Sequence, residues 1–280
     1  MRILLTGGRG MLGSTLAKML SGKVLSADLP ECDIRQPESL RKVMREFKPE
    51  AVIHCAAMTN VDGCEAEPET AEQVNVTGSG NVAKLCTEFN ARLVAISTDY
   101  VFAGNAERPY SEADIAIPAT VYGRTKLGGE QQIAKFCPNS VILRTAWLYG
   151  FGGPSFVHTM LKLGRSGKLL KVVNDQIGNP TSTLVVARGV AAMLTRPELT
   201  GIFHLSCEGE ASWYEFAAEI FRLKRLSVDL QPCTTAEFPR PAPRPANSRL
   251  EKANWRKFEL PPLALWQDAL AEFLALEEDL

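Results

Sequence analysis

The 280-residue sequence predicts an α/β fold with a doubly wound parallel sheet and a smaller C-terminal lobe. Three observations support this fold class. Apolar, strand-like runs alternate with helical segments over the first 150 residues, a glycine-rich turn joins the first strand to the first helix, and the alternation becomes less regular afterwards. Because strands that alternate with helices pair in parallel through right-handed crossovers, helices should cover both faces of the sheet.

The first half of the chain supplies most of the sheet. Apolar runs predict strands at residues 2–8, 23–28, 51–57 and 92–97, and a fifth that begins the segment 140–150. Apolar residues at helical spacing predict the intervening helices, at residues 11–22, 37–48, 68–90 and 122–137. The pattern is clearest at 37–48, where Pro37 suits the first helical position and apolar residues follow at 40, 43, 44 and 47.

The second half mixes the same elements less regularly. Helices are expected at residues 155–167, 181–197 and 212–225, and strands at 169–175 and 201–207. The proline-dense stretch 238–250 should be extended, and the last segment, 261–280, is amphipathic.

Composition excludes several classes of function. The net charge is −1 with a pI of about 6.4, and no basic block indicates binding to nucleic acid or anionic lipid. No apolar run approaches the ~18 residues of a membrane span, and the N-terminal strand enters its glycine turn too early for a signal peptide. Seven cysteines without a CxxC pair, and no zinc-like spacing, predict a reduced, cytoplasmic protein without a metal site.

The turn TGGRGMLG, residues 6–13, carries glycines at the spacing GxxGxxG between a strand and a helix. Glycine permits a tight turn and close approach of a pyrophosphate, and the helix N-terminus presents free N–H groups to that anion. The sequence therefore predicts a Rossmann-type NAD(P) site, with the cofactor held by Gly7, Arg9, Gly10, Met11, Leu12 and Gly13.

Two residues give opposite indications of cofactor preference. Asp28 ends the second predicted strand, where a carboxylate binds ribose hydroxyls and favours NAD. Arg9 lies within the glycine loop, where a guanidinium faces a 2′-phosphate and favours NADP. The choice between NADH and NADPH therefore stays open. Asp33 and Ile34 are expected beside the adenine.

The stretch VYGRTK places Tyr122 and Lys126 on one helix face, four residues apart. An isolated pair of this kind is usually an ordinary surface feature. Here Thr98 follows a predicted strand, at the edge of the sheet where ligands bind. We expect Thr98 to donate to a carbonyl oxygen, Tyr122 to protonate that oxygen as hydride arrives, and Lys126 to hold the nicotinamide ribose and lower the Tyr122 pKa. Lowering the pKa of a phenol from ~10 to ~7 requires a free-energy change of roughly 4 kcal/mol in favour of the phenolate.

Several longer motifs make a resemblance specific. The glycine loop, STDYVF (97–102) and YGRTKLGGE (122–130) resemble those of extended short-chain dehydrogenases/reductases that act on nucleotide sugars. The closer resemblance is to the dTDP-4-dehydrorhamnose reductase family, and it runs nearly end to end. Its further motifs are AAMTNVDGCEAEP (56–68), RTAWLYG (144–150), VVNDQIGNPT (172–181), SWYEFA (212–217) and RPANSRL (244–250).

The resemblance implies a catalytic triad of Thr98, Tyr122 and Lys126. It implies hydride transfer from NADPH or NADH to the C4 ketone of dTDP-4-dehydro-β-L-rhamnose, giving dTDP-L-rhamnose for cell-surface polysaccharide biosynthesis. Two alternatives remain: a reductase or epimerase on another nucleotide 4-keto sugar, and a non-catalytic NADP-binding regulator resembling the methionine adenosyltransferase beta subunit. Residues 1–150, joined by 181–207, should form the NAD(P)-binding domain, and residues 151–180 and 208–280 the substrate-binding lobe.

Further site residues follow from matching positions. The cofactor should also contact Ala56, Ala57 and Thr59. Trp147 is expected beside the sugar or in the core, and Asp99 contacts sugar hydroxyls or caps a turn. Arg249 suits a nucleotide phosphate because a guanidinium matches phosphate geometry. The remaining candidates for binding the substrate are Val61, Tyr100, Asn174 and Gln176.

The chain departs from the family at two positions. Some members dimerise through a divalent metal held by glutamates, but the matching residues here are Thr15 and Leu184. Neither supplies a carboxylate ligand. We therefore predict a monomer, or a homodimer without a metal bridge, and no metal requirement. Met58 replaces the aromatic residue or histidine frequent in the AAxT motif.

Overall fold

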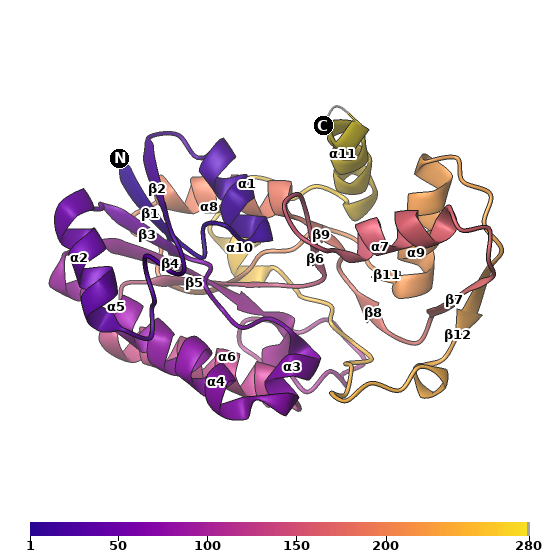
Figure 1. Ribbon diagram of the computed structural model, residues 1–280, viewed down its shortest axis with the longest axis horizontal. Helices are drawn as coiled ribbons and strands as arrows, with labels where there is room; N and C mark the ends of the chain where they lie inside the picture. The colour runs from indigo at the N-terminus through magenta and orange to yellow at the C-terminus, as the bar shows by residue number, and fades with distance from the viewer. Residues whose placement is uncertain (279–280) are drawn as a thin grey trace.

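The central sheet confirms the predicted fold class. Figure 1 shows the computed structural model, which describes residues 1–278. Six parallel strands lie in the order β10-β5-β4-β3-β1-β2. The strand order therefore reverses between the neighbouring strands β1 and β3, as in a doubly wound sheet. The strands are β1 (Arg2–Thr6), β2 (Lys23–Ala27), β3 (Ala51–His54), β4 (Arg92–Thr98), β5 (Val141–Thr145) and β10 (Gly201–His204).

Helices cover both faces of this sheet (Figure 1). Successive side chains of a strand point to opposite faces, so Ile3 and Leu5 join one apolar core and Leu4 joins the other. This arrangement explains why the strands read as continuous apolar runs. One face packs against α1 (Met11–Met19), α8 (Thr183–Leu194) and α10 (Ala253–Lys257), and the other against α2 (Pro37–Phe47), α5 (Ser79–Glu88) and α6 (Val121–Phe136).

The segment expected to be mostly helical, 68–90, consists of α4 (Pro68–Glu72), a π-helical turn (Gln73–Gly78) and α5. Asn75 lies buried in this turn, accepts a hydrogen bond from the Met58 backbone N–H (2.8 Å) and donates to the Met58 carbonyl (3.1 Å). A π-helical turn often marks a functional site. Here it fixes the loop after β3 beside α6.

The second lobe has its own aromatic core, which includes Tyr149, Phe216 and Phe273. Its helices are α7 (Phe156–Gly164), α9 (Trp213–Leu223) and α11 (Trp266–Glu278). Residues 279–280, the end of the predicted amphipathic segment, lie outside the described residues. Short strand pairs complete the lobe: β7 (Leu170–Val173) with β12 (Leu230–Cys233), β8 (Ile177–Gly178) with β11 (Ala211–Ser212), and β6 (Leu148–Tyr149) with β9 (Thr181–Ser182).

The chain crosses between the two regions more than once. After β9 it returns to the sheet, where α8 packs on α1 and β10 pairs with β5. Sequence patterns missed α3 (Val61–Ala66), β12 and α10, because these elements are too short to show a period. Within residues 1–278, no helix has the length and apolarity needed to cross a membrane.

Candidate active site

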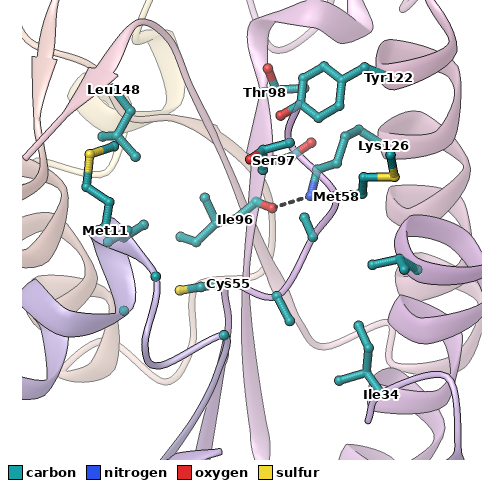
Figure 2. Close-up of a pocket in the computed structure, with 18 of the residues that line it drawn as sticks. Met11, Ile34, Cys55, Met58, Ile96, Ser97, Thr98, Tyr122, Lys126 and Leu148 are labelled. Atoms are coloured by element: carbon teal, nitrogen blue, oxygen red, sulfur yellow. Dashed lines mark hydrogen bonds between the residues drawn. The ribbon is translucent and has the colours of Figure 1, made fainter. Parts of the chain in front are cut away.

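A cavity of about 750 Å³ lies at the carboxyl ends of the parallel strands, between the glycine loop and α6. Figure 2 shows Thr98 beside Tyr122 on one side, and Met11 of the glycine loop with Leu148 on the other. The cavity thus joins the two groups of residues that the sequence singled out, although they are separated by about a hundred residues of chain.

The glycine loop has the geometry of a cradle for a pyrophosphate. Gly7 has φ +69°, and a Cβ on Gly13 would lie 2.2 Å from the Gly7 carbonyl oxygen. Gly10 precedes the first turn of α1 and makes no side-chain cap, so backbone N–H groups of that turn remain available to an anion. The residues of the loop that line the cavity are Gly7, Gly10, Met11, Leu12 and Gly13. The loop therefore fits a dinucleotide.

Asp28 lines the cavity at the end of β2. Its carboxylate accepts hydrogen bonds from the backbone N–H groups of Arg9 (3.0 Å) and Leu29 (2.9 Å). The Arg9 side chain is exposed, does not line the cavity, and forms an ion pair with Glu31 (3.0 Å). Of Asp28 and Arg9, the two residues that gave opposite indications of cofactor preference, only Asp28 lines the cavity.

Asp33 and Ile34 also line the cavity. Arg35 lies there too, although sequence reasoning missed it, and it donates to Asp33 (2.7 Å). This hydrogen bond holds the pKa of Asp33 below its usual value. Arg35 is a cationic group at the end of the cavity where the resemblance places the adenosine.

Tyr122 and Lys126 lie one turn apart on α6, and both are buried in the cavity wall. The Lys126 Nζ donates to the Ile96 carbonyl oxygen (2.8 Å), as Figure 2 shows. Burial raises the pKa of Tyr122, and its hydrogen bond with the Thr98 side chain only partly opposes this effect. The predicted lowering of the Tyr122 pKa by Lys126 is therefore wrong for this structure, because burial dominates and the ammonium is bonded to β4.

The pKa shifts leave both groups protonated at neutral pH. The raised pKa keeps the Tyr122 phenol available as a proton donor, although it makes the phenol a weaker acid than one whose pKa lies near the working pH. Burial lowers the pKa of Lys126 to about 8, so its ammonium is largely charged at neutral pH. Electrostatic attraction to Glu130, one turn further along α6, opposes that lowering.

Thr98 ends β4 and forms a small network with its neighbours. Its hydroxyl donates to Asp99 Oδ1 (2.9 Å) and accepts from the Tyr100 backbone N–H (3.2 Å). Burial raises the pKa of Asp99 to about 6, and hydrogen bonds with the Ser248 and Thr98 side chains only partly oppose this effect. Asp99 thus lines the cavity and also orders the turn after β4.

A buried ion pair fixes the helix that bears Tyr122. Glu130 accepts hydrogen bonds from Arg144 of β5, through Nε (2.9 Å) and Nη2 (2.6 Å), and from Ser97 of β4 (2.5 Å). The Arg144 and Glu130 side chains are 3% and 5% exposed. One carboxylate therefore ties α6 to two strands near their carboxyl ends. Sequence reasoning missed this pair, although Glu130 lies two turns after Tyr122 on the same face.

The predicted residues of the loop after β3 and of the substrate region divide into two groups. Those that line the cavity are Ala56, Ala57, Thr59, Val61, Tyr100 and Trp147. Asn174, Gln176 and Arg249 do not line it. Asn174 accepts from Ser212 (2.7 Å), and Arg249 forms an ion pair with Glu210 (3.1 Å). The roles of both groups in binding remain predictions.

Other lining residues were missed, and most follow the ends of strands. The rule that ligands bind at the carboxyl ends of parallel strands would have found them. Thr145, at the end of β5, has a buried hydroxyl without a hydrogen-bond partner among the described residues. The missed set includes Cys32, Arg35, Cys55, Thr70, Val74, Ile96, Ser97, Thr145, Ala146 and Leu148.

The two positions at which some members of the resembled family carry metal-binding glutamates lie on α1 and α8, which pack against each other. The Thr15 hydroxyl donates to Thr183 (3.0 Å), and Leu184 is buried. No group of three or more His, Cys, Asp or Glu side chains within residues 1–278 is arranged to hold a metal ion.

Comparison with known proteins assigns the family. The family model described as RmlD substrate binding domain matches residues 1–278. A dTDP-4-dehydrorhamnose reductase from Clostridium acetobutylicum has a similar structure, with a TM-score of 0.96 and 43% identity, covering 99% of this chain and 100% of that one. The chain belongs to the dTDP-4-dehydrorhamnose reductase family.

Two further family relatives bear on the cofactor and the sugar. The dTDP-4-dehydrorhamnose reductase from Bacillus anthracis, solved in complex with NADP, has a TM-score of 0.95 and 35% identity, covering 98% of each chain. A protein from Streptomyces antibioticus named a probable dTDP-4,6-dihydroxy-2-methyloxan-3-one 4-ketoreductase is 41% identical, covering 97% of this chain and 94% of its own.

Proposed function

We propose that this protein is a reductase that transfers hydride from NAD(P)H to the C4 ketone of dTDP-4-dehydro-β-L-rhamnose and forms dTDP-L-rhamnose. The observation that carries the proposal is the arrangement of Thr98, Tyr122 and Lys126 in the cavity that also contains the glycine loop. The family and the names of the relatives support dTDP-4-dehydrorhamnose as the substrate.

The residues divide the work of reducing a ketone. The bound, reduced nicotinamide supplies the hydride. Thr98 orients the carbonyl oxygen, for which its hydroxyl turns from Asp99 toward the substrate. Tyr122 donates the phenolic proton to that oxygen, so a carbon–hydrogen and an oxygen–hydrogen bond form while the C=O double bond becomes a C–O single bond. Lys126 holds the nicotinamide ribose through its ammonium, which lies one turn from Tyr122 on α6.

The cofactor is NADPH or NADH. Both oxygens of Asp28 already accept backbone N–H groups, and Arg35 places a guanidinium in the cavity. These contacts favour NADPH, because a guanidinium binds a 2′-phosphate and an occupied carboxylate is less available to ribose hydroxyls.

The proposal extends to the organisation of the chain. Residues 1–150 with 181–207 form the NAD(P)-binding domain, and residues 151–180 and 208–280 the substrate-binding lobe. Separate cores on the two faces of the sheet and in the second lobe support this division for most of the chain, whereas Trp255 and Leu260, although late in the sequence, pack in a core of the sheet. We place the enzyme in the cytoplasm, as a monomer or a homodimer without a metal bridge.

One alternative has a specific observation in its favour. The Streptomyces antibioticus relative is named for a different dTDP-4-keto sugar. The same triad would reduce that ketone, because the chemistry at C4 is unchanged and only contacts to the other sugar carbons differ. A regulatory role like that of the methionine adenosyltransferase beta subunit does not require the triad, which is intact here.

The test is direct. Purified protein is mixed with dTDP-4-dehydrorhamnose and either NADPH or NADH, and loss of reduced-nicotinamide absorbance is followed, with Tyr122→Phe as control. Rapid oxidation that the variant abolishes supports the proposal and Tyr122 as the acid. Folded protein that binds NADPH yet oxidises neither cofactor would exclude this substrate and favour another sugar or a regulatory role.

A further inference from the structure

Two tryptophans from distant parts of the chain stack face to face beside the cavity. The ring centroids of Trp147 and Trp213 lie 3.6 Å apart, and the ring planes differ by 5°. Trp147 follows β5 and lines the cavity, whereas Trp213 begins α9 in the second lobe and does not line it. The stack therefore connects the second lobe to the wall of the cavity.

Trp147 depends on its surroundings for its orientation. Its φ of +48° lies in the left-handed region, which bulky residues rarely adopt unless their environment imposes it. Gly178 of β8 lets the indole lie against the backbone, since a Cβ there would be 2.4 Å from the Trp147 Cε2 atom. The stack and Gly178 together leave the indole little freedom to turn.

Trp213 is itself fixed in one orientation. Its Nε1 donates to the Gln176 side-chain oxygen (3.1 Å), and the Gln176 amide nitrogen donates to Thr235 (2.9 Å). Gln176 is buried, so this hydrogen bond is shielded from water. Phe156 packs against Trp213 with ring centroids 4.6 Å apart.

We propose that Trp213 is a positioning residue for the sugar. Trp213 holds the Trp147 indole against the cavity, and Gln176 holds Trp213. The inference rests on the proposed function, because it takes the ligand to be a dTDP-hexose. An indole offers an apolar surface, which matches the C–H groups and methyl group of a 6-deoxyhexose. Gln176 thus acts through Trp213 and not on the sugar itself.

The experiment separates the sugar from the rest of the ligand. Titration calorimetry measures binding of dTDP-L-rhamnose, dTDP and NADPH to the wild type, Trp213→Leu and Gln176→Met. The matched control is Trp266→Leu, which removes another buried indole from the same lobe. The Trp266 indole packs on Phe216 and not on Trp147. Circular dichroism in the indole absorption bands follows the stack, because two indoles held in contact in one fixed, asymmetric arrangement give a coupled signal.

We expect Trp213→Leu to lose the coupled signal and to bind dTDP-L-rhamnose about three- to tenfold more weakly, the range expected for one aromatic pair. Binding of dTDP and NADPH should change less than about twofold. Gln176→Met should show a smaller loss of the same kind, and it tests the inference even if Trp213→Leu does not fold. Trp266→Leu should keep the ratio of dTDP-L-rhamnose to dTDP affinity.

Three results would overturn the inference. The first is unchanged dTDP-L-rhamnose binding after the coupled signal is lost. The second is equal weakening of all three ligands, which indicates a general effect on the lobe. The third is wild-type protein that binds dTDP-L-rhamnose no better than dTDP. By contrast, selective binding without NADPH oxidation would contradict the proposed activity and leave the positioning role standing.

Discussion

Removing Arg144 should strongly destabilise the protein. Arg144→Met leaves the Glu130 carboxylate buried with Ser97 as its remaining hydrogen-bond partner, since Arg144 supplies the other two bonds. With side chains 3% and 5% exposed, this pair belongs to the buried class, for which removing one partner costs about 3–5 kcal/mol. Urea denaturation gives the free energy of unfolding.

A second substitution tests whether the uncompensated charge is the cause. Glu130→Gln removes the charge and keeps groups that can bond Ser97, so Glu130→Gln/Arg144→Met should be more stable than Arg144→Met alone. The exposed pair Arg188–Glu272 offers a matched control, and Arg188→Met should cost less than about 1 kcal/mol.

The pair should also affect Lys126. Attraction to Glu130 raises the pKa of Lys126, so Glu130→Gln should move the alkaline limb of the activity profile to lower pH.

Two results would refute the reasoning about the stability of the ion pair. One is an Arg144→Met variant whose free energy of unfolding falls by less than about 1 kcal/mol, and the other is a Glu130→Gln/Arg144→Met variant that is no more stable than Arg144→Met.

Four other predictions concern the cavity. Tyr122→Phe should reduce kcat by about 10²–10⁴-fold with NADPH binding retained, measured by steady-state kinetics and calorimetry; undiminished kcat would exclude Tyr122 as the acid. As pH rises through about 8, Lys126 loses its proton, so kcat/KM should fall about tenfold per unit, and a flat profile to pH ~10 would contradict that role. Gly13→Ala places a Cβ 2.2 Å from the Gly7 carbonyl oxygen, so NADPH affinity should fall. Gly167→Ala, where φ is +67° and the space is open, is the control for glycine replacement. Arg35→Ala should raise KM for NADPH more than KM for NADH, and equal changes would exclude contact with a 2′-phosphate.

Periodicity and composition were sufficient for the central fold. The strands at 2–8 and 92–97 and the helices at 37–48 and 122–137 were predicted within a few residues, because an apolar strand buried on both faces and a long amphipathic helix have unmistakable patterns. The ends of these strands also placed the glycine loop and Thr98 at one edge of the sheet. Such information is local, so a single sequence contains it.

Contacts between distant segments were decided only by the tertiary structure. Burial of the Tyr122 phenol raises its pKa, the opposite of the expected effect, and the Lys126 ammonium donates to the Ile96 carbonyl. The Glu130–Arg144 pair and the Trp147–Trp213 stack likewise join residues with no shared local pattern. The sequence by itself determined which chemical groups this protein has and which strand ends bear them. Packing decided which of them touch, since burial and hydrogen bonding depend on neighbours that only the folded chain brings together.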